Sequence, residues 1–143
     1  MSGFIKSHTY LVIPDDALEV DSRMVQEFLM KCGSKIVNVT PECMLVSRQD
    51  DTYVAVSFTC RMIILSYIKA GNIAHRQYLE RNDYSFDELK GHISKLLNKQ
   101  EFGKLPVYLN GEKKDQYSQL GCFVDPESIL ENYIFAESRT SRP

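Results

Sequence analysis

One stretch near the C-terminus constrains the fold more than any other: residues 121–135, Gly-Cys-Phe-Val-Asp-Pro-Glu-Ser-Ile-Leu-Glu-Asn-Tyr-Ile-Phe. The pattern is typical of a buried strand, a tight turn at Asp125-Pro126, and a second segment that sets Glu131 among apolar neighbours. Burying an ionised carboxylate costs several kcal/mol unless it is paired or bound to a metal. Glu131 therefore needs a partner, and we expect His8 and His75 to meet it.

The same stretch also fits a helix. Asp125 then becomes the N-cap and Pro126 takes the first helical position, where its missing N–H does no harm. Four apolar side chains fall on one side of such a helix: Ile129, Leu130, Tyr133 and Ile134. On this interpretation Glu131 is solvated and no site forms around it. The sequence leaves the choice between strand and helix open.

Length and composition indicate one domain, residues 1–143, with a sizeable core. Hydrophobic residues make up 43% and charged residues 25% of the chain, which are ordinary globular values. The net charge is −2 with scattered Lys and Arg, so we expect no nucleic-acid partner. No leader segment and no run long enough to cross a membrane is expected. The four cysteines lack a Cys-x-x-Cys pair, which favours reduced thiols in a cytoplasmic protein.

The first half of the chain predicts a strand, a helix and several strands. A helix beginning at Asp21 or Ser22 ends at Gly33, and its apolar stripe is expected in the core: Met24, Val25, Phe28, Leu29 and Cys32. The predicted strands of this half are 8–13, 35–40, 43–48, 53–58 and 60–68, although 43–68 fits either two strands or three. The turn Ala70-Gly71-Asn72 then divides the chain into two modules, about 5–69 and about 72–135.

The second half predicts the same order of elements. A strand at about 73–80 precedes a helix that opens with the capping box Ser85-Phe-Asp-Glu88. Strands are expected at 105–109 and 117–124, and a frayed tail at 136–143. Two half-sheets of this kind can bury their apolar faces against each other.

The order of these motifs resembles the vicinal-oxygen-chelate superfamily, which includes glyoxalases, fosfomycin-resistance enzymes and extradiol dioxygenases. The likeness lies in His8-Thr-Tyr-Leu-Val-Ile-Pro-Asp15, in Phe28 to Gly33, in Ile73-Ala-His75 and in Phe123-Val-Asp-Pro126 with Glu131. The resemblance implies an α+β fold: paired βαβββ modules form a curved, barrel-like mixed sheet with helices outside. It also implies a homodimer.

The same resemblance implies a metal site and an activity. His8, His75 and Glu131 match the three ligands of a divalent metal, Mn, Fe, Ni or Zn, with an open side for substrate oxygens. The implied protein is a metal-dependent enzyme, a transferase, hydrolase or dioxygenase, acting on a small oxygen-chelating substrate. The alternative is a metal-free ligand-sequestering or protein-interaction protein of the same fold.

Other residues are assigned roles around this site. Thr9, beside His8, and Asp51, a candidate general base at a strand start, are the predicted catalytic residues. Tyr10 is a predicted substrate-binding residue. Predicted anchors for an anionic group of the substrate are Lys113, Lys114 and Arg139.

Overall fold

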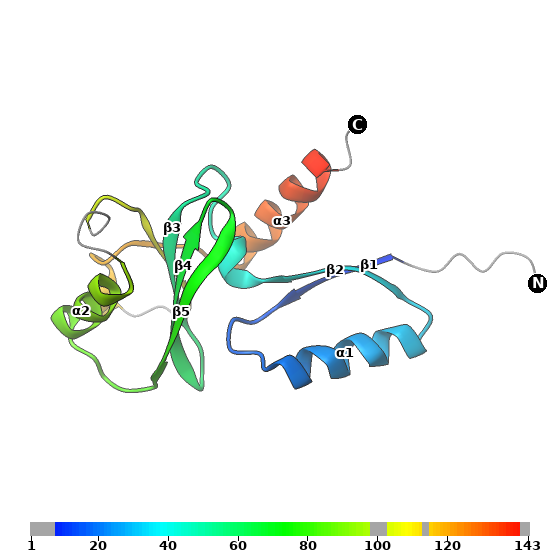
Figure 1. The fold of residues 1–143 in the computed structure, drawn as a ribbon, viewed down its shortest axis with the longest axis horizontal. Coiled ribbons are helices and arrows are strands. Elements are labelled where there is room, and N and C mark those ends of the chain that lie inside the picture. Colours follow the sequence, from blue (N-terminus) through cyan, green and yellow to red (C-terminus); the bar gives the residue numbers. More distant parts are fainter. Residues whose placement is uncertain (1–7, 98–102, 113–114, 141–143) are drawn as a thin grey trace, which may run out of the picture. The chain divides into compact units, whose positions relative to one another are not determined.

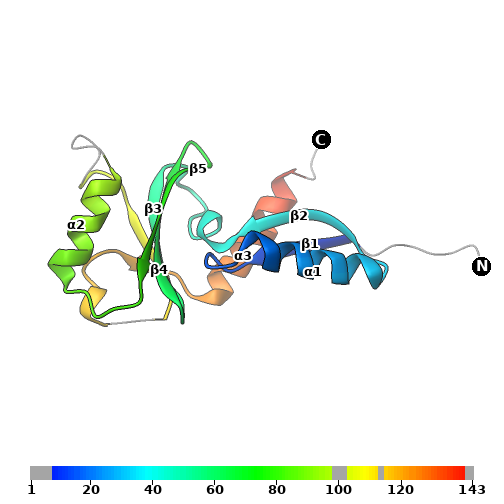
Figure 2. The same cartoon turned by 60° about the horizontal axis from the view of Figure 1, so that its bottom comes forward.

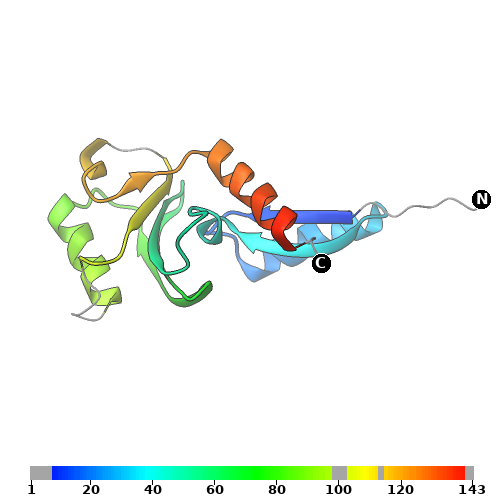
Figure 3. The same ribbon diagram turned by 90° about the horizontal axis from the view of Figure 1, so that it is seen from above.

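The computed structural model describes residues 8–97, 103–112 and 115–140. The chain divides into two compact units, Met1–Glu42 and Cys43–Pro143. Each unit has its own sheet, of two strands in the first and five in the second. Figures 1, 2 and 3 show these elements from three directions.

The first unit is a β-α-β arrangement. Strand β1 (His8–Ile13) leads into helix α1 (Glu19–Lys31), which is followed by strand β2 (Lys35–Pro41). The two strands pair in parallel, with His8 opposite Lys35 and Ile13 opposite Pro41. As predicted, α1 stops before Gly33, whose φ of +91° is a left-handed conformation that glycine adopts without strain.

The second unit is built on an open mixed sheet with the strand order β5-β4-β3-β6-β7. The strands β3 (Tyr53–Phe58), β4 (Met62–Lys69) and β5 (Asn72–Glu80) form an antiparallel meander. Strand β6 (Val107–Gly111) pairs in parallel with β3, and β7 (Cys122–Phe123) pairs in parallel with β6. The central strand β3 is therefore buried on both faces along its whole length.

Helix α2 (Phe86–Leu96) covers one face of this sheet (Figure 1). It begins at the predicted cap, where the Ser85 side chain accepts a hydrogen bond from the Glu88 N–H. Its buried residues Leu89 and Ile93 join a core with side chains from the four neighbouring strands, among them Val54, Val56, Phe58, Ile63, Leu65, Leu79 and Leu109. Leu89 and Ile93 are four residues apart, so they belong to an apolar stripe along α2 that faces the sheet.

Helix α3 (Pro126–Thr140) follows β7 directly. The Asp125 carboxylate accepts a hydrogen bond of 2.8 Å from the Ser128 N–H, so residues 125–135 take the helical alternative and not the strand. The helix buries Ile129 and Tyr133, while Glu131 is exposed. The helix continues through residue 140, where a frayed tail was expected.

The predicted fold class is wrong. The described strands form an open five-stranded sheet and a two-stranded sheet, not paired βαβββ modules closed into a barrel. The turn at residues 70–72 joins β4 and β5, which are adjacent strands of one sheet, so it does not separate two modules. Residues 43–48, predicted as a strand, instead hold a short 3₁₀ turn, η1 (Glu42–Met44), and irregular chain.

Candidate functional site

The three predicted metal ligands lie on three different elements. His8 is on β1 of the first unit, His75 is on β5 of the second unit, and Glu131 is on α3. All three side chains are exposed. The described residues contain no group of three His, Cys, Asp or Glu side chains that could hold a metal ion. His75 and Glu131 thus lie on separate elements of the second unit, and His8 belongs to the first unit.

The residues predicted to act beside the metal are also scattered. Thr9 and Tyr10 are on β1, and the exposed Asp51 lies in the loop before β3, where its carbonyl oxygen accepts a hydrogen bond from the Gly71 N–H. Lys113 and Lys114 lie outside the described residues. Arg139 is within α3, but its side chain is not described. Their roles in substrate binding stay predictions.

In the second unit, the carboxyl ends of the parallel strands β3, β6 and β7 meet at one edge of the sheet. This edge is where open α/β sheets bind ligands as a rule. It carries the β3–β4 turn at residues 59–61, the end of β6 at Gly111, and the start of α3 after Asp125. Backbone N–H groups and cationic side chains are the features that would bind phosphate here.

Three backbone N–H groups at the β3–β4 turn donate hydrogen bonds within the turn. The Thr59 side-chain oxygen accepts hydrogen bonds from the N–H groups of Arg61 (3.2 Å) and Met62 (3.1 Å). The Thr59 N–H donates to the Met62 carbonyl oxygen at 3.0 Å. A phosphate group would have to displace these bonds before it could bind the turn.

Two further places along the strand-end edge, Arg81 and the start of α3, also have internal partners. Arg81 donates to the Thr59 carbonyl oxygen at 2.6 Å and forms an ion pair with Glu112. At the start of α3, the Asp125 carboxylate occupies the position that an anionic ligand would take. Its hydrogen bonds from Ser128 hold the pKa of that carboxyl below its usual range, so it stays ionised at neutral pH. The described groups named here would therefore have to exchange partners before a nucleotide phosphate could bind at this edge.

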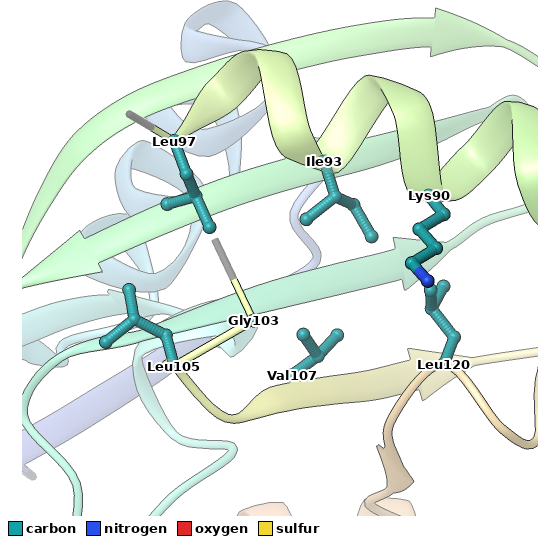
Figure 4. A pocket seen from close by; sticks show the side chains of 7 residues that line it. All are labelled: Lys90, Ile93, Leu97, Gly103, Leu105, Val107 and Leu120. Carbon is teal, nitrogen blue, oxygen red and sulfur yellow. The ribbon is translucent and has the colours of Figure 1, made fainter. Parts of the chain in front are cut away.

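A pocket of about 290 Å³ lies between α2 and β6 (Figure 4). Its lining is almost wholly apolar, with Lys90 at one side and with Ile93, Leu97, Leu105, Val107 and Leu120 around it. Among the described residues that line it, Lys90 is the single charged group, so these residues offer no set of polar groups that would select a ligand.

The first unit shows the opposite character, because it exposes apolar surface. Helix α1 has no buried residue. Val20, Met24 and Phe28 are 65%, 63% and 65% exposed. They recur at every fourth position, so they form one continuous row along the helix, which we call the apolar row. The half-buried residues of α1 lie on the opposite side, and Gln26 there donates to the Ser22 side-chain oxygen at 3.0 Å.

A second row of side chains runs beside the apolar row. It consists of Glu19, Arg23, Glu27 and Lys31, which also recur at every fourth position, and all four are exposed. We call it the charged row. The Arg23 guanidinium lies 2.6 Å from the Glu19 carboxylate, an ion pair between residues four apart. Together the two rows make an apolar surface with a charged border, which is typical of a docking surface between proteins.

Part of this surface is predicted from the sequence to lie in the core. Met24, Val25 and Phe28 have the spacing of a buried helix face, yet the structure leaves all three more than 40% exposed. Periodicity identifies an apolar face and does not tell what covers it. No signal in the sequence distinguished this stripe from the stripe of α2, which is buried.

Comparison with known proteins identifies the fold. No protein-family profile and no curated protein matches the sequence. Among solved structures, the ethanolamine utilization protein EutJ from Carboxydothermus hydrogenoformans is similar with a TM-score of 0.57 at 12% identity, over 88% of this chain and 63% of that one. A protein of Bacteroides thetaiotaomicron with an actin-like ATPase fold matches with a TM-score of 0.47 at 9% identity, over 82% and 52%. MreB 5 of Spiroplasma citri bound to AMPPNP matches with a TM-score of 0.45 at 12% identity, over 66% and 31%.

The match to EutJ, with a TM-score of 0.57, shows that the two proteins share a fold. The chain spans less than two thirds of the length of each of these three structures. At such low identity the likeness shows the fold alone. The resemblance to the vicinal-oxygen-chelate superfamily is therefore wrong. The predicted cofactor, Mn, Fe, Ni or Zn, is wrong as well. So is the predicted glyoxalase-like or fosfomycin-resistance-like chemistry.

Within the described residues, no helix is both long and apolar enough to cross a bilayer.

Proposed function

We propose that this chain is a binding and assembly protein that uses an actin-like fold as a scaffold and docks a protein on the outer face of α1. One observation carries the proposal: Val20, Met24 and Phe28 form an unbroken apolar row that is about two-thirds exposed on a helix with no buried residue. Burial of such side chains stabilises a complex by roughly 25 cal/mol per Å² of apolar surface removed from water.

The two-stranded sheet beneath α1 supports the same proposal. Parallel strands normally occur in larger sheets that are covered on both faces. Here β1 and β2 form a sheet of only two strands, and no described side chain on either strand is fully buried. The first unit therefore gains little stability from its own core and has surface left to bury against a partner.

A nucleotide-dependent activity is the natural competitor, because MreB 5 of Spiroplasma citri has been solved with AMPPNP bound. The strand-end edge of the second unit argues against it here. The Thr59 side-chain oxygen accepts hydrogen bonds from two N–H groups of the β3–β4 turn. Glu112 forms an ion pair with Arg81, and the Asp125 carboxylate caps the start of α3. Docking at α1 needs none of these groups to be released.

Two measurements test the proposal. First, thermal unfolding of the full chain with MgATP or MgADP should give the same Tm as without nucleotide. A saturable rise in Tm would show that the strand-end edge, or another part of the chain, binds nucleotide, and would overturn the choice of docking over a nucleotide-dependent activity.

Second, a photoreactive phenylalanine derivative at position 28 should cross-link to a protein in cells. The matched control is the same derivative at Tyr78, an aromatic residue of β5 that is 57% exposed. We expect adducts, identified by mass spectrometry, from position 28 and not from position 78. If position 28 yields no adduct, or if both positions yield the same adducts, α1 is not a docking surface.

A further inference from the structure

We infer that the protein seated on α1 is a second copy of this chain, with the two α1 helices antiparallel. This inference rests on the proposed function, because it names the partner for the same surface. It is carried by the charged row, whose signs run −, +, −, + from Glu19 through Arg23 and Glu27 to Lys31.

Because the signs alternate, the charged row is complementary to the same row of a second helix that runs in the opposite direction. In an antiparallel pair centred on Val25, Glu19 of one helix faces Lys31 of the other, and Arg23 faces Glu27. Each of these contacts occurs twice by symmetry, so all four pairs across the interface have opposite charges. In a parallel pair the two charged rows would lie on opposite sides of the interface and would not meet, so none of these four ion pairs would form.

The apolar row agrees with this arrangement. Rows of side chains at every fourth position act as ridges in helix packing, and such ridges fit into the grooves of a second helix. When the helix is reversed about its middle, Val20 at one end comes near the Phe28 end of the partner, and Met24 stays near the centre. The charged row then lies along the border of the interface, where ion pairs select orientation more than they add affinity.

The charged row has a simpler reading. Opposite charges four residues apart stabilise a single helix, and Arg23 and Glu19 already form such a pair at 2.6 Å. That reading explains the charges and leaves the apolar row beside them uncovered. Self-association accounts for both rows with one contact.

The expected dimer is weak. A pair of 13-residue helices buries less surface than the roughly 1,200–2,000 Å² of a standard protein interface. We therefore expect a Kd on the order of 10–100 µM, which rises with salt because the border ion pairs are exposed.

Sedimentation of the purified full chain over a concentration series provides the first test. Wild type should pass from monomer to dimer, and Met24→Lys should stay monomeric at about 100 µM. The matched control is Leu130→Lys, at an apolar residue of α3 that is 57% exposed, and it should dimerise as wild type does. A monomeric wild type at that concentration, or an equal loss of dimer in both variants, would overturn the inference.

Charge exchange provides the second test and fixes the orientation. Glu19→Lys/Glu27→Lys makes the row wholly positive, and Arg23→Glu/Lys31→Glu makes it wholly negative. Each variant alone should dimerise at least about 10-fold more weakly than wild type, and an equimolar mixture should regain the dimer mass. Recovery on mixing shows that both variants are folded. If the mixture gives no dimer, or if either variant alone pairs as well as wild type, the antiparallel pair is wrong.

Two outcomes separate self-association from docking of another protein at α1. If the purified chain is monomeric while position 28 cross-links to an identified foreign protein in cells, docking at α1 stands and self-association falls. If position 28 cross-links to nothing, both fall.

Discussion

Gly111 passes so close to Phe58 that a β-carbon built on Gly111 would lie 2.1 Å from the Phe58 carbonyl oxygen. The two residues are opposite each other in the parallel pairing of β3 and β6. Gly111 also has a φ of +92°, which is strained for any residue with a side chain. The Glu112 N–H, one residue on, donates to the same oxygen at 2.9 Å.

We therefore expect Gly111→Ala to lower the free energy of unfolding by about 2–4 kcal/mol, because both the contact and the backbone conformation must change. The control is Gly91→Ala in α2, where nothing besides the neighbouring residues and the backbone of the same helix lies within 4 Å of the added carbon. That variant should be more stable than wild type by about 0.5–1 kcal/mol, since alanine is the better helix former. Urea unfolding measures both. Equal stability of Gly111→Ala and wild type would contradict the close approach.

Tyr117 anchors the end of the core next to the strand-end edge. It is fully buried, its ring stacks on Phe58 at 5.2 Å, and its hydroxyl donates to the Tyr84 carbonyl oxygen at 2.5 Å. Tyr117→Phe should keep the stack but leave that oxygen without this hydrogen bond, lowering the free energy of unfolding by about 1–2 kcal/mol. Tyr78→Phe, at an exposed position, should change it by less than about 0.5 kcal/mol. If both variants unfold alike in urea, the hydroxyl of Tyr117 contributes nothing.

Tyr108 should ionise later than an ordinary tyrosine. Burial, and then its hydrogen bond to the Asp50 carboxylate, raise the pKa of the Tyr108 hydroxyl above 10.0. Because the pKa of Tyr108 is raised in the folded state, its protonated hydroxyl contributes fully to the stability of the folded protein below about pH 10. This contribution is lost as the pH rises through the folded-state pKa. NMR titration of labelled tyrosine should place the Tyr108 midpoint above 10.0, and Asp50→Asn should lower that midpoint. An unchanged midpoint in Asp50→Asn would remove Asp50 as a cause.

Asp125 should make the start of α3 sensitive to acid. The hydrogen bonds from Ser128 lower the pKa of the Asp125 carboxyl. The ionised carboxylate therefore stabilises the folded protein fully above pH 3.8, and this stabilisation is lost as the pH falls through the lower pKa of the folded state. Asp125→Ala should therefore be less stable than wild type at neutral pH, with a gap that narrows in acid. Urea unfolding from neutral to acid pH measures this difference in the free energy of unfolding. Asp125→Asn keeps an acceptor without a titrating group, so its stability relative to Asp125→Ala should not vary with pH.

Local signals in the sequence predicted the elements that are fixed locally. Ser85 and Glu88 indicated the start of α2, Gly33 indicated the end of α1, and alternating β-branched residues indicated β1 and β3. Residues 43–48 misled because their apolar side chains are buried without pairing to a strand, as Cys43 and Leu45 show. Apolar character predicts burial there, and it does not predict hydrogen-bonding pattern.

The predicted metal site depended on two things that local patterns do not fix. It required residues 125–135 to be a strand, whereas Asp125 and Pro126 begin a helix on which Glu131 is exposed. It also required three residues far apart in sequence to converge. Such convergence depends on strand order, and the parallel insertion of β6 beside β3 has no signature within either segment.

That insertion sets an order for folding. The meander of β3, β4 and β5 closes through short turns, but β3 gains its second neighbour only when residues 107–111 arrive. Early contacts should thus form within residues 53–80, and pulse-labelled hydrogen exchange should find β4 amides protected before those of β6. During synthesis on the ribosome, the whole meander is made before β6. Until β6 is made, the N–H and C=O groups on one side of β3 have no strand to pair with. A chain arrested at that stage presents a template for pairing with the wrong strand, and we expect it to be the species most prone to aggregate.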